Sequence, residues 1–151
     1  MAEENTFNAG SGVGEVTGRA YYANVVTPNT TFDDKWEISL VLDDDTLTDF
    51  ENRGHPIKEK DFGRFVHFKR NVEKKSGGHN PRPILIDENR KRVDTLPKMG
   101  NGSLVKIQYN EYSWSYQGKA GKGRDLRALQ LLELVEYNEP DGAGMYDEGD
   151  Y

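Results

Sequence analysis

Residues 100–116 read GNGSLVKIQYNEYSWSY, and their pattern is the clearest indication of the fold. A Gly-Asn-Gly turn signal stands at its start. Beyond it, Val105, Ile107 and Tyr109 mark one apolar side, while the even positions after Leu104 are polar or aromatic. A period of two is typical of a strand with one buried face. The pattern therefore predicts a long strand over residues 103–112.

The rest of the chain repeats this strand pattern. The other expected strands are residues 13–26, 35–42, 62–70 and 125–137, with a small hairpin formed by residues 83–86 and 91–94. Asp43 to Asp45 are expected to cap a short helix over residues 46–52, because carboxylates favour a helix N-terminus. Trp36 lies on an apolar strand face and is expected in the core. Residues 117–124, rich in Gly and Lys, are expected to form a flexible loop.

Five long strands and one short helix predict a mainly β fold. The architecture that fits is a five-stranded Greek-key barrel of the oligonucleotide/oligosaccharide-binding (OB) type. An immunoglobulin-like sandwich is the alternative, but it needs about seven short strands. We expect residues 13–137 to form this domain, between a flexible N-terminus (residues 1–12) and an acidic, disordered C-terminal tail (residues 138–151).

The formal net charge of −6 hides a separation of charge along the chain. Residues 1–51 hold 11 acidic and 2 basic residues, and residues 128–151 hold 7 acidic residues and no basic one. Residues 52–127 hold 8 acidic and 18 basic residues. A ligand responds to the potential within about 8 Å at physiological salt. The basic middle section is therefore a candidate surface for a polyanion.

The same section carries aromatic residues that the alternation places outside the core. Three exposed rings on one face are costly unless something stacks on them, and nucleic-acid bases do so at about 1–3 kcal/mol each. The candidate base-stacking residues are Tyr112, Trp114, Tyr116 and Phe65. The candidate phosphate contacts are Lys106, Lys119, Lys122, Arg124, Lys69, Arg70, Lys74 and Lys75. In the alternative interpretation, the three rings of residues 112–116 cap the barrel end beneath a loop.

Other classes of function have little support in the residues. The chain has no cysteine, which excludes a disulfide framework and a cysteine-based zinc site. The histidines lack the spacing of metal ligands, so we expect no metal, no cofactor and no enzymatic activity. Asp43 to Asp45 leave a Mg²⁺-dependent nuclease as an alternative, although three consecutive side chains diverge. No segment approaches the roughly 20 apolar residues of a membrane span, and the start resembles no signal peptide.

Several motifs occur together in a recognisable order. Gly18-Arg19-Ala20 lies in the first strand, a Trp-Glu-Ile strand follows, and Gly100-Asn101-Gly102-Ser103 opens a Val-Lys-Ile strand before the aromatic residues. The chain ends in an acidic stretch with a terminal aromatic residue. This order resembles the single-stranded DNA-binding proteins of bacteriophage replication, an OB-fold family. The resemblance covers residues 13–137 and the tail.

The resemblance implies coating of single-stranded DNA with little sequence preference, during phage DNA replication and recombination in the cytoplasm of the bacterial host. It also implies a C-terminal tail that recruits a polymerase or helicase and competes with DNA for the groove. The tail residues concerned are Glu139, Asp141, Asp147, Glu148, Asp150 and Tyr151. A phage structural or adaptor protein with no DNA role remains a further alternative, and the sequence leaves open whether the chain forms a homodimer.

Overall fold

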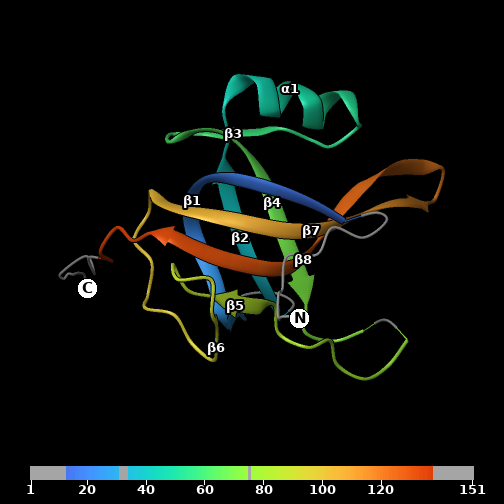
Figure 1. Ribbon diagram of the computed structural model, residues 1–151. Coiled ribbons are helices and arrows are strands. Elements are labelled where there is room, and N and C mark those ends of the chain that lie inside the picture. The colour runs from blue at the N-terminus through green and yellow to red at the C-terminus, as the bar shows by residue number, and fades with distance from the viewer. Residues whose placement is uncertain (1–12, 31–33, 75, 138–151) are drawn as a thin grey trace, which may run out of the picture.

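The structure, a computed structural model, describes residues 13–30, 34–74 and 76–137 (Figure 1). Its elements in chain order are β1 (Val13–Asn29), β2 (Lys35–Val41), α1 (Asp44–Asn52), β3 (Lys58–Lys60), β4 (Gly63–Asn71), β5 (Ile84–Ile86), β6 (Arg92–Val93), β7 (Ser103–Tyr116) and β8 (Lys119–Glu133). The predicted flexible N-terminus and acidic tail lie outside the described residues, as does Lys75. Among the helices described, none has the length and apolar character to cross a membrane.

One sheet closes on itself to form the barrel. Its strand order is β3-β4-β2-β1-β7-β8-β5-β6, and an additional parallel pairing joins β4 to β8, with Lys69 opposite Asp125. Five strands (β1, β2, β4, β7 and β8) therefore make a closed barrel, which confirms the predicted OB-type fold. Helix α1 connects β2 to the β3–β4 hairpin and lies across one end of the barrel (Figure 1).

The alternation in the sequence predicts the barrel interior well. Val105 and Ile107 have no exposed surface and Tyr109 only 3%. Trp36 is buried as expected. Phe62, at the start of the strand expected over residues 62–70, lies instead in the turn between β3 and β4 and is only partly buried. The core itself was therefore predictable from periodicity, while its edges were not.

The acidic run before the helix acts as the predicted cap. Asp43 is the N-cap residue, and its Oδ1 accepts a hydrogen bond of 2.8 Å from the Thr46 amide. Hydrogen bonding by Thr46, first through its side chain and then through its amide, lowers the pKa of Asp43. Asp44 and Asp45 occupy the first turn, where the helix dipole favours carboxylates. Among the described residues, no group of three His, Asp or Glu side chains is arranged to hold a metal ion.

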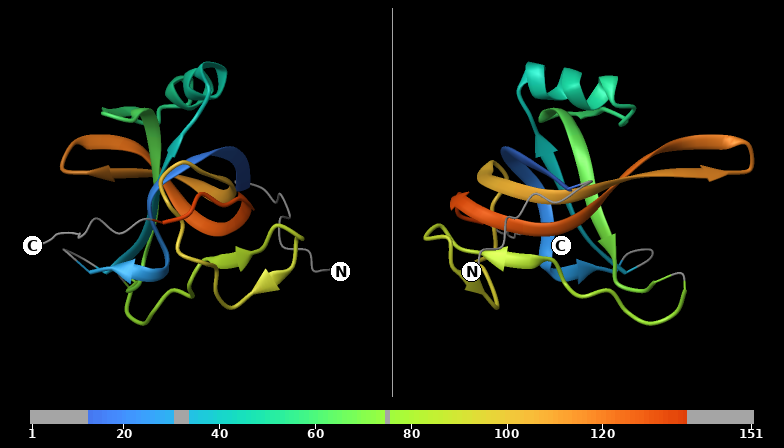
Figure 2. Two further views of the ribbon diagram at one scale, coloured as in Figure 1. Left: turned by 90° about the vertical axis from the view of Figure 1, so that its left-hand side faces the viewer. Right: turned by 45° about the vertical axis from the view of Figure 1, so that its right-hand side comes forward.

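The largest correction concerns the expected loop over residues 117–124. β7 and β8 instead continue as a two-stranded hairpin, paired from Glu111 opposite Arg124 out to Tyr116 opposite Lys119. The turn consists of Gln117 and Gly118 alone, both with positive φ (50° and 79°). Such a two-residue turn matches the right-handed twist of the strands. The outer part of this hairpin stands away from the barrel (Figure 2).

Candidate nucleic-acid interface

The outer part of the β7–β8 hairpin carries the predicted rings on one face. Tyr112, Trp114 and Tyr116 have exposed fractions of 45%, 44% and 69%. Residues directly opposite in an antiparallel pair point to the same side, and the first two rings face Gly123 and Gly121 respectively. The exposure confirms the predicted alternation. The alternative interpretation, in which the rings cap the barrel end, does not fit side chains that stay exposed on a projecting hairpin.

The two glycines provide the space in which the rings lie. A methyl group added at Gly121 would come within 2.6 Å of the Trp114 ring, and one at Gly123 would overlap the Tyr112 ring. Each ring therefore packs across the backbone of its glycine partner. One face of the ring is held by the hairpin, and the opposite face is left for another planar group.

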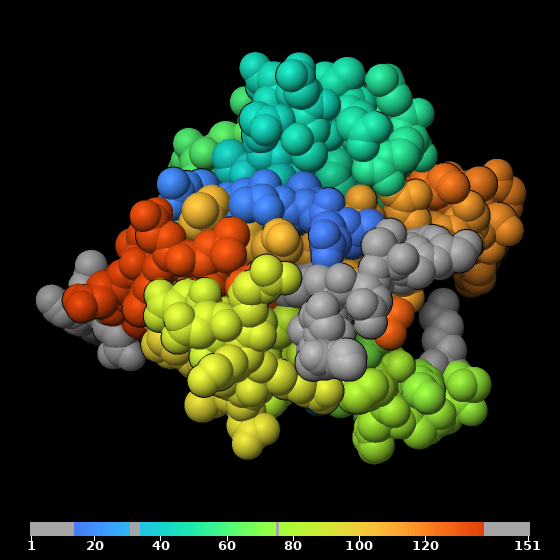
Figure 3. Space-filling view, in the orientation of Figure 1, coloured from blue at the N-terminus to red at the C-terminus, as the bar shows by residue number. Residues whose placement is uncertain are grey.

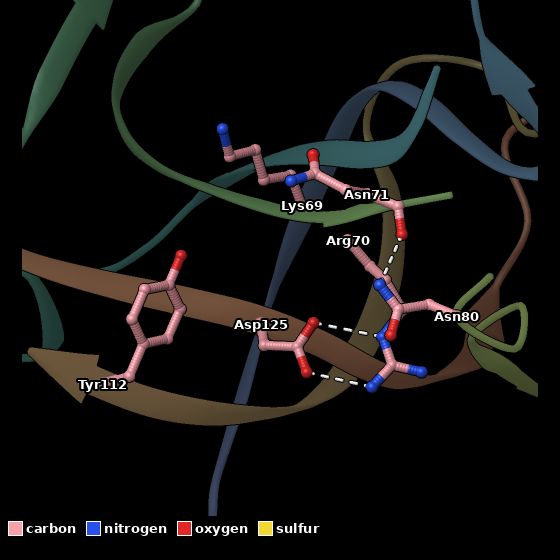
Figure 4. Close-up of a pocket in the computed structure, with 6 residues that line it drawn as sticks. All are labelled: Lys69, Arg70, Asn71, Asn80, Tyr112 and Asp125. Carbon is pink, nitrogen blue, oxygen red and sulfur yellow. Dashed lines mark hydrogen bonds and ion pairs between the residues drawn. The ribbon is translucent and has the colours of Figure 1, made fainter. Parts of the chain in front are cut away.

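A cleft separates this hairpin from the barrel wall at β4. It has a volume of about 470 Å³, and we call it the hairpin cleft; its lining residues are Pro56, His67, Lys69, Tyr112, Trp114, Ser115, Tyr116, Lys122, Gly123 and Arg124. In the space-filling view the hairpin (orange) projects from the body between helix α1 and the loop that follows β4 (Figure 3). An adjacent hollow of about 280 Å³ shares Lys69 and Tyr112 with it (Figure 4). The two hollows are therefore neighbours around one lysine and one ring.

Lys69 and Arg70, which are adjacent on β4, have different roles at these hollows. Lys69 is exposed and lines both of them. Arg70 is instead held by Asp125: its Nε and Nη2 donate to the two carboxylate oxygens at 3.0 and 2.9 Å (Figure 4). Its Nη1 donates to the Pro81 carbonyl at 3.0 Å. The predicted phosphate contact at Arg70 is therefore corrected, because its guanidinium is engaged in closing the barrel.

Arg124 reaches the hairpin cleft in a fixed position. Its Nε donates to the His67 carbonyl at 2.6 Å, and its Nη1 donates to Nδ1 of His55 at 3.0 Å and to the Lys122 carbonyl at 3.1 Å. Burial lowers the pKa of Arg124 from its ordinary value, yet a guanidinium remains charged at neutral pH. Arg124 thus supplies a positive charge that is partly desolvated and anchored on three sides.

His55 is a site residue that the sequence did not reveal. Its side chain is fully buried, and its Nε2 lies 2.9 Å from Oε1 of Glu111. Burial, and then the charges of Arg124 and Arg53, lower the pKa of His55 to about 4. The neutral imidazole donates from Nε2 to Glu111 and accepts at Nδ1 from Arg124. Its partners are 56 and 69 residues away in the chain, so no local motif points to it.

His67 on β4 is likewise neutral. Its Nε2 lies 3.0 Å from Oε1 of Glu37, and its Nδ1 lies 3.4 Å from the Ser39 hydroxyl. Burial lowers the pKa of His67 to about 4, and the opposing effect of Glu37 does not overcome it. The ring therefore donates to Glu37 and adds no positive charge to the cleft at neutral pH. Its carbonyl, in contrast, anchors Arg124.

The prediction that Phe65 stacks on a base is wrong. Phe65 is only 2% exposed. The Phe62 ring lies 5.1 Å away, and the Lys60 ammonium group lies 6.0 Å from the Phe65 ring. The covering segment is β3, which pairs Lys58 with Phe65 and was missed in the sequence. Phe62 stacks in turn on Tyr21, so these rings pack on one another.

The remaining predicted cations fall in different places. Lys122 lines the cleft and donates from Nζ to the Ser113 hydroxyl at 3.0 Å. Lys119 is exposed beside the hairpin turn, and Lys74 is exposed in the loop after β4. Lys106 lies in the part of β7 that pairs with both β1 and β8, and it lines neither hollow. The cations that the structure brings together at the cleft are Lys69, Lys122 and Arg124.

Comparison with known proteins relates this barrel to one class of structures. No protein-family model matches the chain, and no curated protein matches it. Among solved structures, gp2.5, a single-stranded DNA-binding protein encoded by bacteriophage T7, aligns with a TM-score of 0.60 and 18% identity over 92% of this chain and 97% of that chain. The single-stranded DNA-binding protein from bacteriophage Enc34, solved with ssDNA, aligns with a TM-score of 0.63 and 15% identity over 84% and 89%.

A C-terminally truncated form of the Enc34 protein gives a similar result, with a TM-score of 0.62 and 15% identity over 85% of this chain and 89% of that chain. The chain therefore has the OB-type fold found in single-stranded DNA-binding proteins of bacteriophages. At these identities the likeness establishes the fold.

Proposed function

We propose that this protein binds single-stranded DNA with little sequence preference. Bases stack on Tyr112, Trp114 and Tyr116, and the cations of the hairpin cleft contact the phosphates. The observation that carries the proposal is a row of exposed rings, two of them seated on glycine backbone, beside a cleft lined by Lys69, Lys122 and Arg124. Lys122 and Arg124 pair with Ser113 and Glu111 on the hairpin face opposite to the rings, so the strand of DNA would meet rings and cations on different sides of the hairpin. Stacking accepts every base, because each base has a π-face.

The spacing of the rings favours a single strand over a duplex. Alternate residues of a strand are about 6.8 Å apart, whereas stacked bases of B-DNA rise by about 3.4 Å. Bases that lie on successive rings must therefore be separated from their neighbours in the stack. A duplex resists this separation, while a single strand can be splayed at a lower cost.

The electrostatic part of binding follows from the basic middle section of the chain. Residues 52–127 hold 18 basic and 8 acidic residues and include every cation of the hairpin cleft. Each phosphate contact on a single strand releases counterions and adds about −0.7 to the slope of log K against log salt. Binding through Lys69, Lys122 and Arg124 is thus expected to be salt-sensitive.

The biological role that fits this activity is protection of single-stranded DNA during phage replication and recombination, in the cytoplasm of the host. The acidic tail (residues 138–151) would recruit a replication protein such as a polymerase or helicase and act as a mimic of DNA. Its charge is opposite to that of the basic section, and such a segment can occupy the cleft when DNA is absent. A nuclease is not favoured, since Asp43 caps α1.

Tryptophan fluorescence tests the proposed function directly. The chain has two tryptophans, of which Trp36 is buried (7% exposed) and Trp114 lies on the hairpin (44% exposed). Titration with oligo-dT should quench the emission of Trp114, and added salt should reverse the effect. In Trp114→Ala the remaining emission of Trp36 should not respond. Absence of salt-sensitive quenching, or equal quenching in the variant, would refute the proposal.

A further inference from the structure

Four charged or polar side chains form a chain of contacts beneath the hairpin cleft. Arg53, at the C-terminal end of α1, pairs with Glu111 on β7. Glu111 accepts a hydrogen bond from His55 at 2.9 Å, and His55 accepts one from Arg124 at 3.0 Å. The series therefore runs from the helix that covers the barrel end to the strand β8 that lines the cleft.

The contacts of Arg124 fix the orientation of its guanidinium group. Its hydrogen bonds to the His67 carbonyl, His55 and the Lys122 carbonyl use Nε and Nη1. Nη2 carries two further N–H groups and belongs to a residue that lines the hairpin cleft. An arginine that is held in this way loses less conformational freedom when it meets a phosphate.

We propose that His55 and Glu111 are positioning residues for nucleic-acid binding, which hold the Arg124 guanidinium at the wall of the cleft so that its Nη2 meets a phosphate. This inference rests on the proposed function. His55 does not touch the nucleic acid, because its side chain has no exposed surface, and Glu111 acts on Arg124 through its hydrogen bond with His55.

The protonation state of His55 suits this role. Only a neutral imidazole can accept the Arg124 hydrogen bond at Nδ1, and burial keeps the pKa of His55 at about 4. The charged groups around it are Arg124 and Lys122 on β8, Arg53 and Asp49 on the helix side, and Glu111 on β7. Glu111 accepts from Nε2 and so selects the required tautomer.

The surrounding packing keeps the imidazole in place. The Phe50 ring meets His55 at 5.2 Å in an edge-on arrangement, and Arg53 lies 4.6 Å above the same Phe50 ring. Phe50 is itself buried in the barrel core. His55 therefore links the position of Arg124 to the packed core of the barrel, although the hairpin beside the cleft projects from the barrel.

Two substitutions of His55 test the roles of its two ring nitrogen atoms separately. In His55→Asn the side-chain oxygen occupies the place of Nδ1 and can still accept from Arg124. In His55→Gln the amide replaces Nε2, and the acceptor for Arg124 is lost. We would measure the Kd for oligo-dT over a range of salt concentrations in these variants, in Arg124→Ala and in the double variant His55→Gln/Arg124→Ala.

The expected results form a pattern that a purely structural role would not give. Arg124→Ala should reduce the salt slope by about 0.7, the value of one phosphate contact. His55→Gln should weaken binding about two- to tenfold and reduce the slope in the same direction, and it should add no further loss to Arg124→Ala. His55→Asn should rescue the slope. An unchanged slope in His55→Gln, or losses that add in the double variant, would overturn the inference.

A measurement on the free protein separates this inference from the proposed function. In NMR spectra the Nη1 and Nη2 groups of Arg124 should give distinct signals in the wild type and in His55→Asn, and averaged signals in His55→Gln. If His55→Gln does not fold, Glu111→Gln provides the second variant, with a smaller change in the same direction. Distinct Arg124 signals in a folded His55→Gln would refute the positioning role, whereas absence of DNA binding in the wild type would refute the function.

Discussion

Gly121 and Gly123 each lie opposite an aromatic residue in the β7–β8 hairpin. Glycine weakens a strand interior by about 0.5–1 kcal/mol relative to alanine, so two of them at alternate positions call for a physical reason. The reason is the close approach of the Trp114 and Tyr112 rings, which fill the space that a side chain would take. The rings cover the glycine backbone, and the glycines hold the rings flat.

Gly121→Ala should therefore weaken DNA binding without unfolding the barrel. The added methyl group would meet the Trp114 ring at 2.6 Å and tilt it from its position. Loss of one stacked base costs about 1–3 kcal/mol, which corresponds to about a 5- to 150-fold increase in Kd for oligo-dT.

Ala120→Ser is the matched control for this prediction. Residue 120 is exposed on the same strand and pairs with Ser115, on the hairpin face opposite to the rings. Its substitution should leave the Kd within about twofold. A Gly121→Ala variant that binds as tightly as the wild type would show that the position of the Trp114 ring is not used.

At the scale of the elements, the pairing of β4 with β8 both closes the barrel and places the cleft. Lys69 and Arg70 are adjacent on β4 but do different things. Arg70 joins β4 to Asp125 on β8, and only 12% of its side chain is exposed. Lys69 is exposed and faces the two hollows. Arg70 thus stabilises the barrel, whereas Lys69 is available to contact a ligand in the cleft.

Two alanine substitutions should separate these roles. Arg70→Ala should lower the free energy of unfolding by about 1–3 kcal/mol, because Asp125 loses its charged partner in a partly buried site. Lys69→Ala should change it by less than about 0.5 kcal/mol but reduce the salt slope of DNA binding by about 0.7. Urea unfolding and salt-dependent titration check the two effects. Equal losses of stability in both variants would contradict this division.

The elements that could be predicted are those with a clear local pattern. Strict alternation identified β2 and the first part of β7, and the Asp43 cap identified α1. The start of β8 could not be predicted, because its glycines are typical of a loop until the rings opposite them are known. The segment β3 (Lys58–Lys60) consists only of charged residues and was not predicted as a strand. Without β3, Phe65 was expected to be exposed, whereas it is buried.

The candidate site likewise contains residues that could be predicted from the sequence and residues that could not. The rings of Tyr112, Trp114 and Tyr116 were predictable, because their exposure follows from the period of one strand. The roles of Arg70 and His55 were not, since the side chains that hydrogen-bond with them lie 55 or more residues away. A sequence shows that a cation exists, while only the fold shows whether a carboxylate already holds it.

At the scale of the whole molecule, the hairpin and the origin of the acidic tail lie on opposite sides. The end of β8 and residues 134–137 emerge on the side of the barrel away from the hairpin (Figures 1 and 2). Along β8, Gly123 and Glu133 are separated by up to about 33 Å. The tail, residues 138–151, can span at most about 50 Å, and a flexible chain of its length averages about 20 Å. It can reach its own cleft only in conformations that are clearly more extended than this average.

Deletion of residues 138–151 should therefore raise the affinity for DNA by a modest factor, about two- to fivefold at low salt. The effect should fade as salt rises, because screening weakens the attraction between the tail and the cleft. A full-length variant with the five tail carboxylates replaced by amides should behave like the deletion. Unchanged affinity at low salt in both variants would reject the competitor role and leave partner recruitment untouched.

We expect a single strand of DNA, not a duplex, to bind along the hairpin. The most direct measurement is a competition assay in which labelled oligo-dT bound to the protein is displaced by unlabelled single-stranded DNA or by a duplex of the same length, at two salt concentrations. We expect the single strand to displace the label at a much lower concentration than the duplex, and its advantage should persist at the higher salt, since stacking is not screened. Equal displacement by the duplex at both salt concentrations would contradict it.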